Sequence, residues 1–256
     1  MKIALCMSGH MRTWEKCYDN LKKNILSKYE VDIFISTWNV IDYQGNIDDE
    51  NIVNLDDISK IYGSSLKECE IENYQEVLPF LSEHASNITA NIGVGCQPIR
   101  CISMFYKNYK SINMIRNLDY DIVIKTRPDL VYFGDIVLED INSINIPIEQ
   151  PINNGKIYND DIDYYIGSII DTFGGYPDSM IYSNKENMLN FSNLYNEYYN
   201  YWLSGHTLHP ELLLKFHLDK VKSDVKRTKF GVEILRKNKK KDGSFIHDIN
   251  NDRVFY

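Results

Sequence analysis

Charged side chains follow directly after a short apolar run near the middle of the chain. Residues 122–124, Ile-Val-Ile, predict a buried strand, and Arg127 and Asp129 come where that strand should end. In open α/β sheets, ligands bind outside the carboxyl ends of the strands. A carboxylate there can hold Mg2+ or Mn2+, which prefer oxygen ligands, and an arginine can bind a phosphate through two hydrogen bonds. The spacing indicates a phosphate or metal site, and a surface salt bridge is the competing interpretation.

A second polar turn follows the first apolar run, residues 3–7. Ser8, Gly9, His10 and Arg12 lie in it. Gly9 permits a close backbone approach, the Ser8 hydroxyl can bond a ribose or a phosphate, and Arg12 can pair with a diphosphate. The turn lacks the Gly-Lys-Ser/Thr ending of a Walker A loop. A nucleotide-binding turn and a simple strand-to-helix turn both remain open.

A carboxylate and two histidines gather near residue 210. Glu211 falls in the first turn of a predicted helix, where the helix dipole stabilises an ionised carboxylate. An inverting transferase needs such a carboxylate to deprotonate the acceptor hydroxyl. Acidic residues are common in first turns for electrostatic reasons alone, so this pattern is not specific. His206 and His209 could line a site or form a zinc pair, but no third ligand follows at the usual spacing.

The elements that position these residues alternate between strands and helices. The first two apolar runs enclose a helical segment, which predicts a parallel sheet from the start of the chain. We expect an α/β fold with a mostly parallel central sheet flanked by helices. Strands are predicted at 3–7, 32–37, 66–71, 121–125, 168–172 and 225–235, with largely apolar segments at 136–138 and 144–148. Helices are predicted at 14–26, where Thr13 can act as the cap, and at 56–62, 73–81, 98–117, 177–201 (in two pieces) and 210–220.

Composition limits the classes of function. The 256 residues carry a formal net charge of -8, which argues against a dedicated nucleic-acid binder. The five cysteines form no CxxC pair, so a reduced, cytoplasmic compartment fits best. No apolar run approaches the ~20 residues that span a bilayer. Residues 237–241 hold four lysines and could touch anionic lipid at a membrane surface, although a solvated basic loop is the simpler interpretation. We expect one domain over 1–236 and a charged tail over 237–256.

Several segments resemble glycosyltransferases in their order along the chain. "DYDIVIKTRPDLVYF" resembles the strand and DxD-type motif of GT-A glycosyltransferases. "MKIALCMSGHMRTW" followed by "VDIFISTWN" resembles the start of small bacterial and large-virus polysaccharide glycosyltransferases, including the WavE-like group of lipopolysaccharide enzymes. "DTFGGYPDSM" and "HPELLL" match more weakly, and the matching pieces cover less than half of the chain. The resemblance implies a single GT-A-like domain, in the cytoplasm or in the host cytoplasm if the protein is viral.

The resemblance also implies partners and residue roles. The donor would be a nucleotide diphosphate sugar and the acceptor a glycan or a lipid-linked sugar. Arg127 replaces the first acidic residue of the DxD-type motif, which leaves the dependence on Mn2+ or Mg2+ open. The implied donor-binding residues are Ser8, Gly9, His10, Arg12, Arg127 and Asp129; the implied catalytic residues are Glu211 as base and Asp171 at the sugar hydroxyls; the implied metal ligands are Asp129 and His247.

Two other functions fit parts of the same pattern. The turn at Ser8–Thr13 faintly resembles the phosphosulfate loop of sulfotransferases, which need no metal. A non-catalytic sugar-binding protein would also place polar residues at a sheet edge. These three functions predict different ligands, so a ligand screen can separate them.

Overall fold

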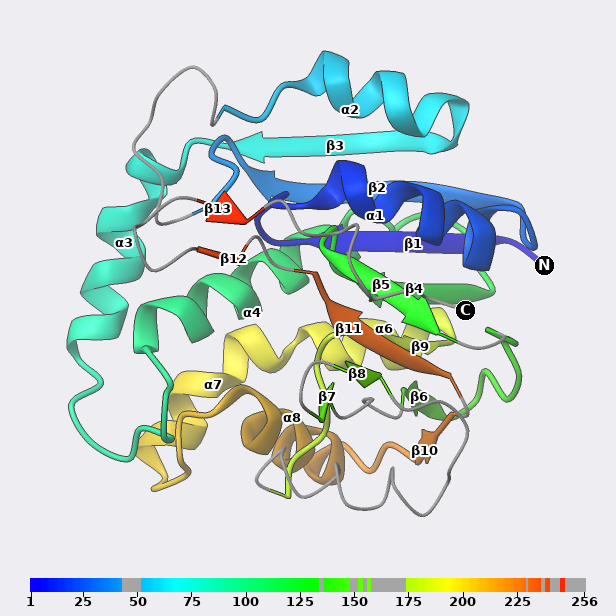
Figure 1. Cartoon of the computed structure of the whole chain (residues 1–256). Coiled ribbons are helices and arrows are strands. Elements are labelled where there is room, and N and C mark those ends of the chain that lie inside the picture. Colours follow the sequence, from blue (N-terminus) through cyan, green and yellow to red (C-terminus); the bar gives the residue numbers. More distant parts are fainter. Residues whose placement is uncertain are drawn as a thin grey trace.

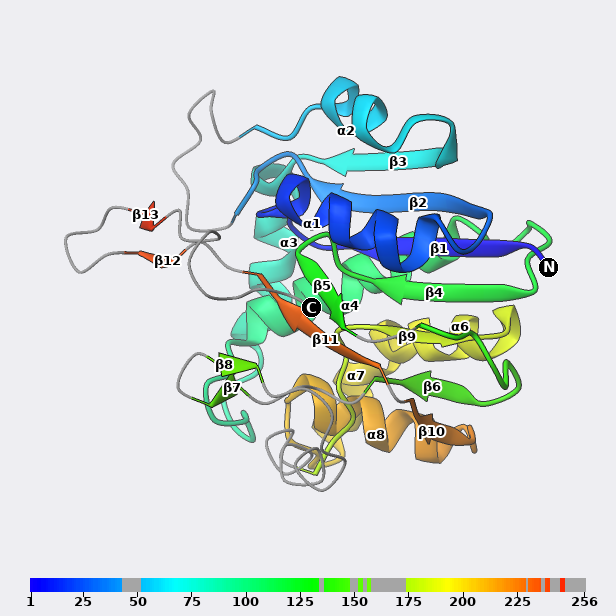
Figure 2. The same ribbon diagram turned by 45° about the vertical axis from the view of Figure 1, so that its right-hand side comes forward.

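The chain folds around a seven-stranded sheet covered on both faces (Figures 1 and 2). The computed structural model describes residues 1–42, 52–133, 136–147, 152–153, 156–157, 174–228, 230–235, 238–239 and 245–246. The strands of the sheet lie in the order β10-β6-β9-β4-β1-β2-β3. None of the helices in these ranges is long and apolar enough to cross a membrane.

The first half of the chain alternates between strands and helices, as the sequence predicts. Its strands are β1 (Ile3–Ser8), β2 (Val31–Trp38), β3 (Leu66–Glu72) and β4 (Ile122–Thr126). Its helices are α1 (Trp14–Leu21), which continues into a π-helical turn (Lys22–Leu26), then α2 (Leu55–Tyr62), α3 (Tyr74–Ser86) and α4 (Pro98–Asn113). A 3-10 turn, Gly63–Ser65, joins α2 to β3.

The second half contains shorter strands and three helices that pack together. Its strands are β5 (Leu130–Phe133), β6 (Ile144–Ile146), β9 (Ile181–Ser183), β10 (Val225–Arg227) and β11 (Gly231–Ile234). Its helices are α6 (Lys185–Ser192), α7 (Leu194–Leu203) and α8 (Pro210–Lys220). Two short antiparallel pairs lie outside the main sheet: β7 (Ile152–Asn153) with β8 (Lys156–Ile157), and β12 (Asn238–Lys239) with β13 (Phe245–Ile246).

The sheet is mostly parallel. β1 pairs in parallel with β2 and β4, β2 with β3, and β10 with β6. β9 lies antiparallel between β4 and β6, so it is the one reversed strand of these seven. All residues of β1 and β4 are buried, as expected for strands with a layer on each face. The predicted α/β class with a mostly parallel sheet flanked by helices is confirmed.

The side chains of each strand alternate between two cores. On β4, Val123 points to the core formed with α4, α6, α7 and α8. Ile122 and Ile124 point to the opposite core, which Trp14 of α1 and Ile58 of α2 help to form. A ribbon of β5 and β11 covers part of this second face (Figure 2). Different parts of the chain therefore pack on the two faces of the sheet, and the strands are buried between them.

Two segments differ from the sequence-based prediction. Residues 177–201 were predicted to be helical, but Ile181–Ser183 forms β9, and the helices begin only where Asn184 accepts a hydrogen bond from the Asn187 N–H. The three β9 residues are fully buried and pair with both neighbours, so sheet pairing outweighs local helix preference. Residues 225–235 were predicted as one strand, but the chain changes sheets after β10 and continues as β11 beside β5.

Leu235, which directly follows β11, forms hydrogen bonds with Thr13 and with Asp129. Thr13 stands at the N-cap position of α1, yet its hydroxyl makes no cap hydrogen bond and donates instead to the carbonyl of Leu235 at 2.8 Å. The Leu235 N–H donates to the carbonyl of Asp129, also at 2.8 Å. The predicted capping role of Thr13 is therefore wrong, because a long-range acceptor takes its hydroxyl.

The order of the strands reverses beside β1. β2 and β3 follow on one side of β1, whereas β4 lies on the other side. Met7 stands opposite Thr126, so Ser8 and Arg127 leave the sheet at the same level. A crevice outside such a reversal point is where open α/β sheets bind their ligands.

A buried lysine ties the ends of β2 and β3 to α4. Lys107 is fully buried, and its Nζ donates to the carbonyl of Thr37 at 2.7 Å and to Oε2 of Glu72 at 2.5 Å. The same Nζ lies 3.9 Å from the centre of the Trp38 ring. Burial lowers the pKa of Lys107 to about 8, although Glu72 opposes this change. The lysine remains protonated at neutral pH and closes this edge of the sheet.

Replacement of this lysine tests its structural role. Lys107→Met removes the cation and leaves Glu72 without its main partner, so we expect the free energy of unfolding to fall by about 3 kcal/mol. Lys110→Met on the same helix breaks a more exposed pair with Glu70, 2.7 Å away, and should cost less than about 1 kcal/mol. Urea unfolding at pH 7 measures both, and equal effects of the two substitutions would contradict the role given to Lys107.

Candidate functional site

A fully buried carboxylate holds two arginines at the reversal point of the sheet. Asp129 has no exposed surface. Arg127 donates from Nε to Oδ1 at 2.8 Å and from Nη2 to Oδ2 at 2.9 Å. Arg12 donates from Nη1 to Oδ2 at 3.0 Å. The structure thus brings together three of the sequence-predicted site residues, from the loop after β1 and the loop after β4.

The backbone of Arg12 adopts an unusual conformation. Its φ of 43° lies in the left-handed region, which a residue other than glycine enters at a cost of about 1 kcal/mol. Its N–H donates to the carbonyl of Ile41 at 3.1 Å, and its Nε donates to Oδ1 of Asp42 at 3.2 Å. Gly9, with φ 105°, makes the preceding bend, which no other residue type would adopt freely. The surrounding contacts therefore hold the Arg12 side chain in place at the expense of local backbone strain.

The arginines of the cluster contact two carboxylates of the described chain. Arg12 contacts Asp42 and Asp129, and Arg127 contacts Asp129. Burial opposes the charge of Arg127, but Asp129 more than offsets it, so the pKa of Arg127 is raised. A guanidinium carries five N–H donors, of which Asp129 takes two from Arg127. The Arg127 side chain is 18% exposed, so the other donors can serve an anionic ligand.

Ser8 and His10 support the loop after β1. The Ser8 hydroxyl is buried and donates to Oδ1 of Asn108 on α4 at 2.6 Å. The predicted contact of Ser8 with a ribose or phosphate stays a prediction, since this hydroxyl bonds to α4 in the structure. His10 Nδ1 lies 3.2 Å from the carbonyl of Val40, and its ring packs edge-on against Tyr74. Burial, together with the charge of Arg12, lowers the pKa of His10 to about 4, so this ring is neutral at pH 7.

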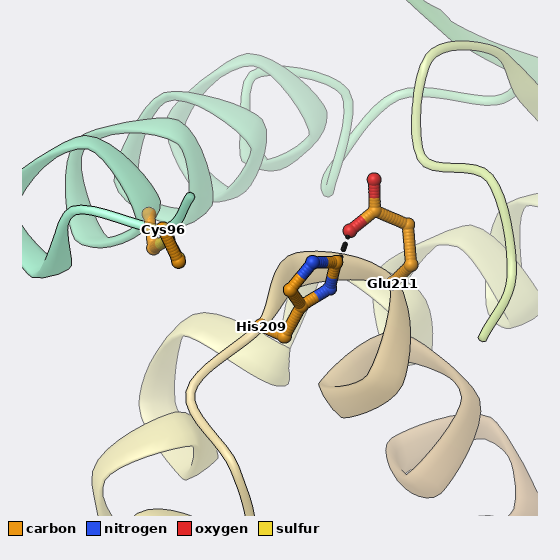
Figure 3. The surroundings of a disulfide bond; sticks show 4 residues. Cys96, His209 and Glu211 are labelled. Carbon is orange, nitrogen blue, oxygen red and sulfur yellow. Dashed lines mark ion pairs between the residues drawn. A yellow bond between two sulfur atoms is a disulfide. The ribbon is translucent and has the colours of Figure 1, made fainter. Parts of the chain in front are cut away.

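A histidine and a glutamate contact each other at the start of α8 (Figure 3). Nδ1 of His209 lies 2.8 Å from Oε2 of Glu211. The His209 side chain is 9% exposed and that of Glu211 is 25% exposed, and Oε2 of Glu211 is itself buried. Burial lowers the pKa of His209, against the effect of Asp178.

The second histidine of this cluster has a different environment. The His206 ring lies 3.6 Å from that of Phe216, centre to centre, and also contacts Tyr201. His209 faces Glu211 instead. Among the described residues, the two histidines belong to no group of three or more side chains that could hold a metal ion.

The loop before β9 joins the two groups of residues. The Tyr176 N–H donates to the carbonyl of Glu211 at 3.0 Å, and the buried Lys125 donates from Nζ to the carbonyl of Asp178. The Asp178 charge acts on both Arg127 and His209. Asp178 is therefore close enough to both Arg127 and His209 for its charge to affect their pKa values. The sequence did not single it out, because its position depends on the antiparallel pairing of β9, although it falls in the glycosyltransferase-like segment DTFGGYPDSM.

The residues that could hold a metal ion are only partly described. Both oxygens of Asp129 accept hydrogen bonds from arginines. Within the described ranges, no group of three His, Cys, Asp or Glu side chains could hold a metal ion. Asp171 and His247, predicted at the sugar hydroxyls and at the metal, lie outside the described residues.

No family model and no curated protein matches this chain. The geometry of the site therefore carries the functional argument.

Two of the five cysteines are paired with each other. Cys96 and Cys101 form a disulfide that joins the loop before α4 to the first turns of that helix. Cys6, Cys17 and Cys69 are free thiols. The loop that carries Cys96 packs beside His209 (Figure 3).

The neutral state of His10 predicts a pH dependence of stability. Its pKa of about 4 in the folded chain lies below the ordinary value of 6.5, so the unfolded chain binds a proton first as the pH falls. Stability is then lost between pH 6.5 and pH 4, by at most about 3 kcal/mol from this residue. His10→Asn keeps a donor for Val40 but does not titrate, so its urea-unfolding free energy should fall less steeply over this range. Parallel curves for the two proteins would refute the assignment.

Proposed function

We propose that this chain is a GT-A-like glycosyltransferase that moves a sugar from a nucleotide diphosphate sugar to a glycan or lipid-linked acceptor. The observation that carries the proposal is the Arg12–Asp129–Arg127 cluster at the reversal point of a mostly parallel sheet. Ligand binding at such a point is a general property of open α/β sheets. The resemblance in sequence supports the choice of a diphosphate ligand, and the position of Glu211 supports transfer to a hydroxyl.

The arginines would act on the leaving diphosphate. Guanidinium groups bind phosphate oxygens through paired, charge-assisted hydrogen bonds. Charge builds up on the diphosphate as the bond to the sugar breaks, and donors already fixed in place stabilise that charge without reorganising. Asp129 fixes both guanidinium groups, so its role in this proposal is to position donors. Gly9 and His10 would lie at the nucleotide in the same loop.

Glu211 would act on the acceptor. Its carboxylate takes the proton of an acceptor hydroxyl, whose oxygen then attacks the anomeric carbon from the side opposite the leaving diphosphate. This single displacement inverts the configuration of that carbon. The loop at Tyr176 connects Glu211 to β4 through Lys125 and Asp178, and this connection supports a shared site for donor and acceptor.

The dependence of the proposed reaction on Mn2+ or Mg2+ requires a separate test. Such an ion would neutralise charge on the diphosphate. The described side chains do not form a site for it, since Asp129 is engaged by two arginines, and we derive no step through the ion.

Nucleotide binding tests the donor site. UDP or GDP at about 100 times its dissociation constant should stabilise the folded chain by about 2.7 kcal/mol and raise the melting temperature by about 5 °C. Arg127→Gln should remove most of this shift, whereas Arg116→Gln, an exposed residue after α4, should keep it. Scans with and without Mn2+ measure the contribution of the metal.

Two outcomes of this screen would overturn the glycosyltransferase proposal. A shift with adenosine 3′,5′-bisphosphate alone would indicate a sulfotransferase. A shift with free sugars that survives both Asp129→Ala and Glu211→Ala, with biological function intact, would indicate a sugar-binding protein.

Replacement of Glu211 tests the acceptor side. Glu211→Gln keeps the shape of the side chain but cannot take a proton, so kcat should fall by about 10²- to 10⁴-fold. The nucleotide-dependent melting shift should remain, because the donor is held by other residues. Glu197→Gln on α7 breaks a partly exposed contact with Lys220 and serves as the control, with kcat unchanged. Full activity of Glu211→Gln would rule out its role as base.

A further inference from the structure

We propose that the Cys96–Cys101 bond is a reversible redox switch: a dithiol that reduces it releases the loop of residues 88–97, the Cys96 loop, from the start of α8. The switch consists of one covalent bond and a few backbone hydrogen bonds, so it does not depend on the proposed function. It connects the redox state of the chain to the segment that leads into Glu211.

The two bonded cysteines differ in their surroundings. Cys101 lies in the first turn of α4, is 4% exposed and packs in the core on that face of the sheet. Cys96 directly precedes Gln97, the N-cap residue of α4, and is only half-buried. Thiol–disulfide exchange requires access of the attacking sulfur to one of the two bonded sulfurs. Cys96 is therefore the sulfur that a reductant reaches from solvent, and Cys101 is the leaving group.

The other three cysteines are poorly suited to compete in this exchange. Burial raises the pKa of Cys17 to about 12, and it also raises the pKa of Cys6. Cys69 on β3 is half-buried, and burial raises its pKa to about 11. Because the thiolate is the attacking form of a cysteine, these thiols are almost inactive at pH 7. The Cys96–Cys101 pair can thus open and close without exchange with another cysteine of the chain.

Backbone hydrogen bonds hold the Cys96 loop to the residue before His209. The Leu208 N–H donates to the carbonyl of Asn91 at 2.7 Å, and the Gly93 N–H donates to the carbonyl of Leu208 at 3.0 Å. These two bonds bracket a single parallel bridge between the loop and Leu208. This pairing is the connection that reduction would release.

The loop contributes little apolar packing of its own. All of its residues are described, and Ile88 is the only one of them that is buried. Val94 is 82% exposed and Ile92 is 37% exposed. Asn91 has a φ of 51°, in the left-handed region that a residue other than glycine adopts at some cost. A segment with few buried contacts opens easily, so the covalent bond supplies much of the restraint on this one.

Release of the loop would act directly on His209. A Cβ atom at Gly93 would lie 2.4 Å from Cδ2 of the His209 ring, so the two residues are in close contact. Leu208, which pairs with the loop, immediately precedes His209, the N-cap residue of α8. Figure 3 shows Cys96 on the loop beside His209 and Glu211. Reduction would therefore uncover this side of His209.

The reduction balances with a dithiol as the electron donor. One thiolate of the dithiol attacks the sulfur of Cys96, the bond to Cys101 breaks, and the Cys101 sulfur leaves as a thiolate and takes up a proton. The second thiolate of the dithiol then displaces the Cys96 sulfur, which also takes up a proton. The dithiol ends as a cyclic disulfide, and the chain has gained two electrons and two protons. The oxidised dithiol reverses both steps.

Hydrogen exchange of the folded chain, followed by NMR, tests the switch. In reduced dithiothreitol, the amides of Gly93 and Leu208 should exchange about tenfold faster than in oxidised dithiothreitol, because the bond restricts the conformations of the open loop. The amides of β1 should exchange equally in both, and reoxidation should restore the slow exchange of the loop. Equal rates for Gly93 and Leu208 in the two states would overturn the proposal.

Two replacements separate this bond from the free thiols. Cys96→Ser cannot form the bond, so the amides of Gly93 and Leu208 should exchange at the fast rate in both buffers. Cys69→Ser removes a half-buried free thiol and should keep the difference between the buffers. A redox response that persists in Cys96→Ser, or that disappears in Cys69→Ser, would contradict the assignment. If Cys96→Ser does not fold, the comparison of the unmodified chain in the two buffers still decides.

The bond must also be reducible in the folded chain. Dithiothreitol followed by iodoacetamide, both without denaturant, should label Cys96 and leave the buried Cys6 and Cys17 unlabelled, as peptide mass spectrometry would show. Labelling of Cys96 only after urea has unfolded the chain would identify a permanent structural bond and refute the switch.

Discussion

A carboxylate without any exposed surface can exist in a folded chain only if cations and hydrogen-bond donors surround it. Asp129 meets this condition through three hydrogen bonds from Arg12 and Arg127. The interaction joins the loop after β1 to the loop after β4, at the point where the strand order reverses. The strained backbone of Arg12, the bend at Gly9 and the hydrogen bond from Leu235 to the Asp129 carbonyl lie in the same two loops.

Acidic side chains along the same edge of the sheet each contact a basic residue. Asp42 takes the second contact of Arg12, Glu72 neutralises Lys107, and Glu211 contacts a neutral His209. A ligand with two negative charges would meet arginines that Asp129 holds in place. Binding such a ligand to Arg127 would depend on the N–H groups that Asp129 does not use.

Local patterns predicted the strands with both faces buried and the helices with clear start signals. The apolar runs of β1, β2 and β4 and the proline at the start of α8 were sufficient for this. β9 was missed because three buried residues carry little periodic signal, and its antiparallel pairing is a long-range property. Asp178 and Asp42 were missed for the same reason, since each becomes a site residue only through contacts with distant parts of the chain. Arg12, Arg127, Asp129 and Glu211 could be singled out from the sequence because residue type at a strand or helix end is itself informative.

The hydrogen bonds of Leu235 also have a consequence for the folding of the chain. Its carbonyl accepts from Thr13, 222 positions earlier, and its N–H reaches the carbonyl of Asp129. Contacts between such distant positions require closure of a long loop, and folds rich in them form slowly. During synthesis, strands β1 to β4 can pair long before residues 230–235 emerge. The loops that carry Arg12 and Arg127 would thus form early, but the hydrogen bonds from Leu235 would form last. The growing chain would therefore hold an incomplete site until almost its whole length has been made.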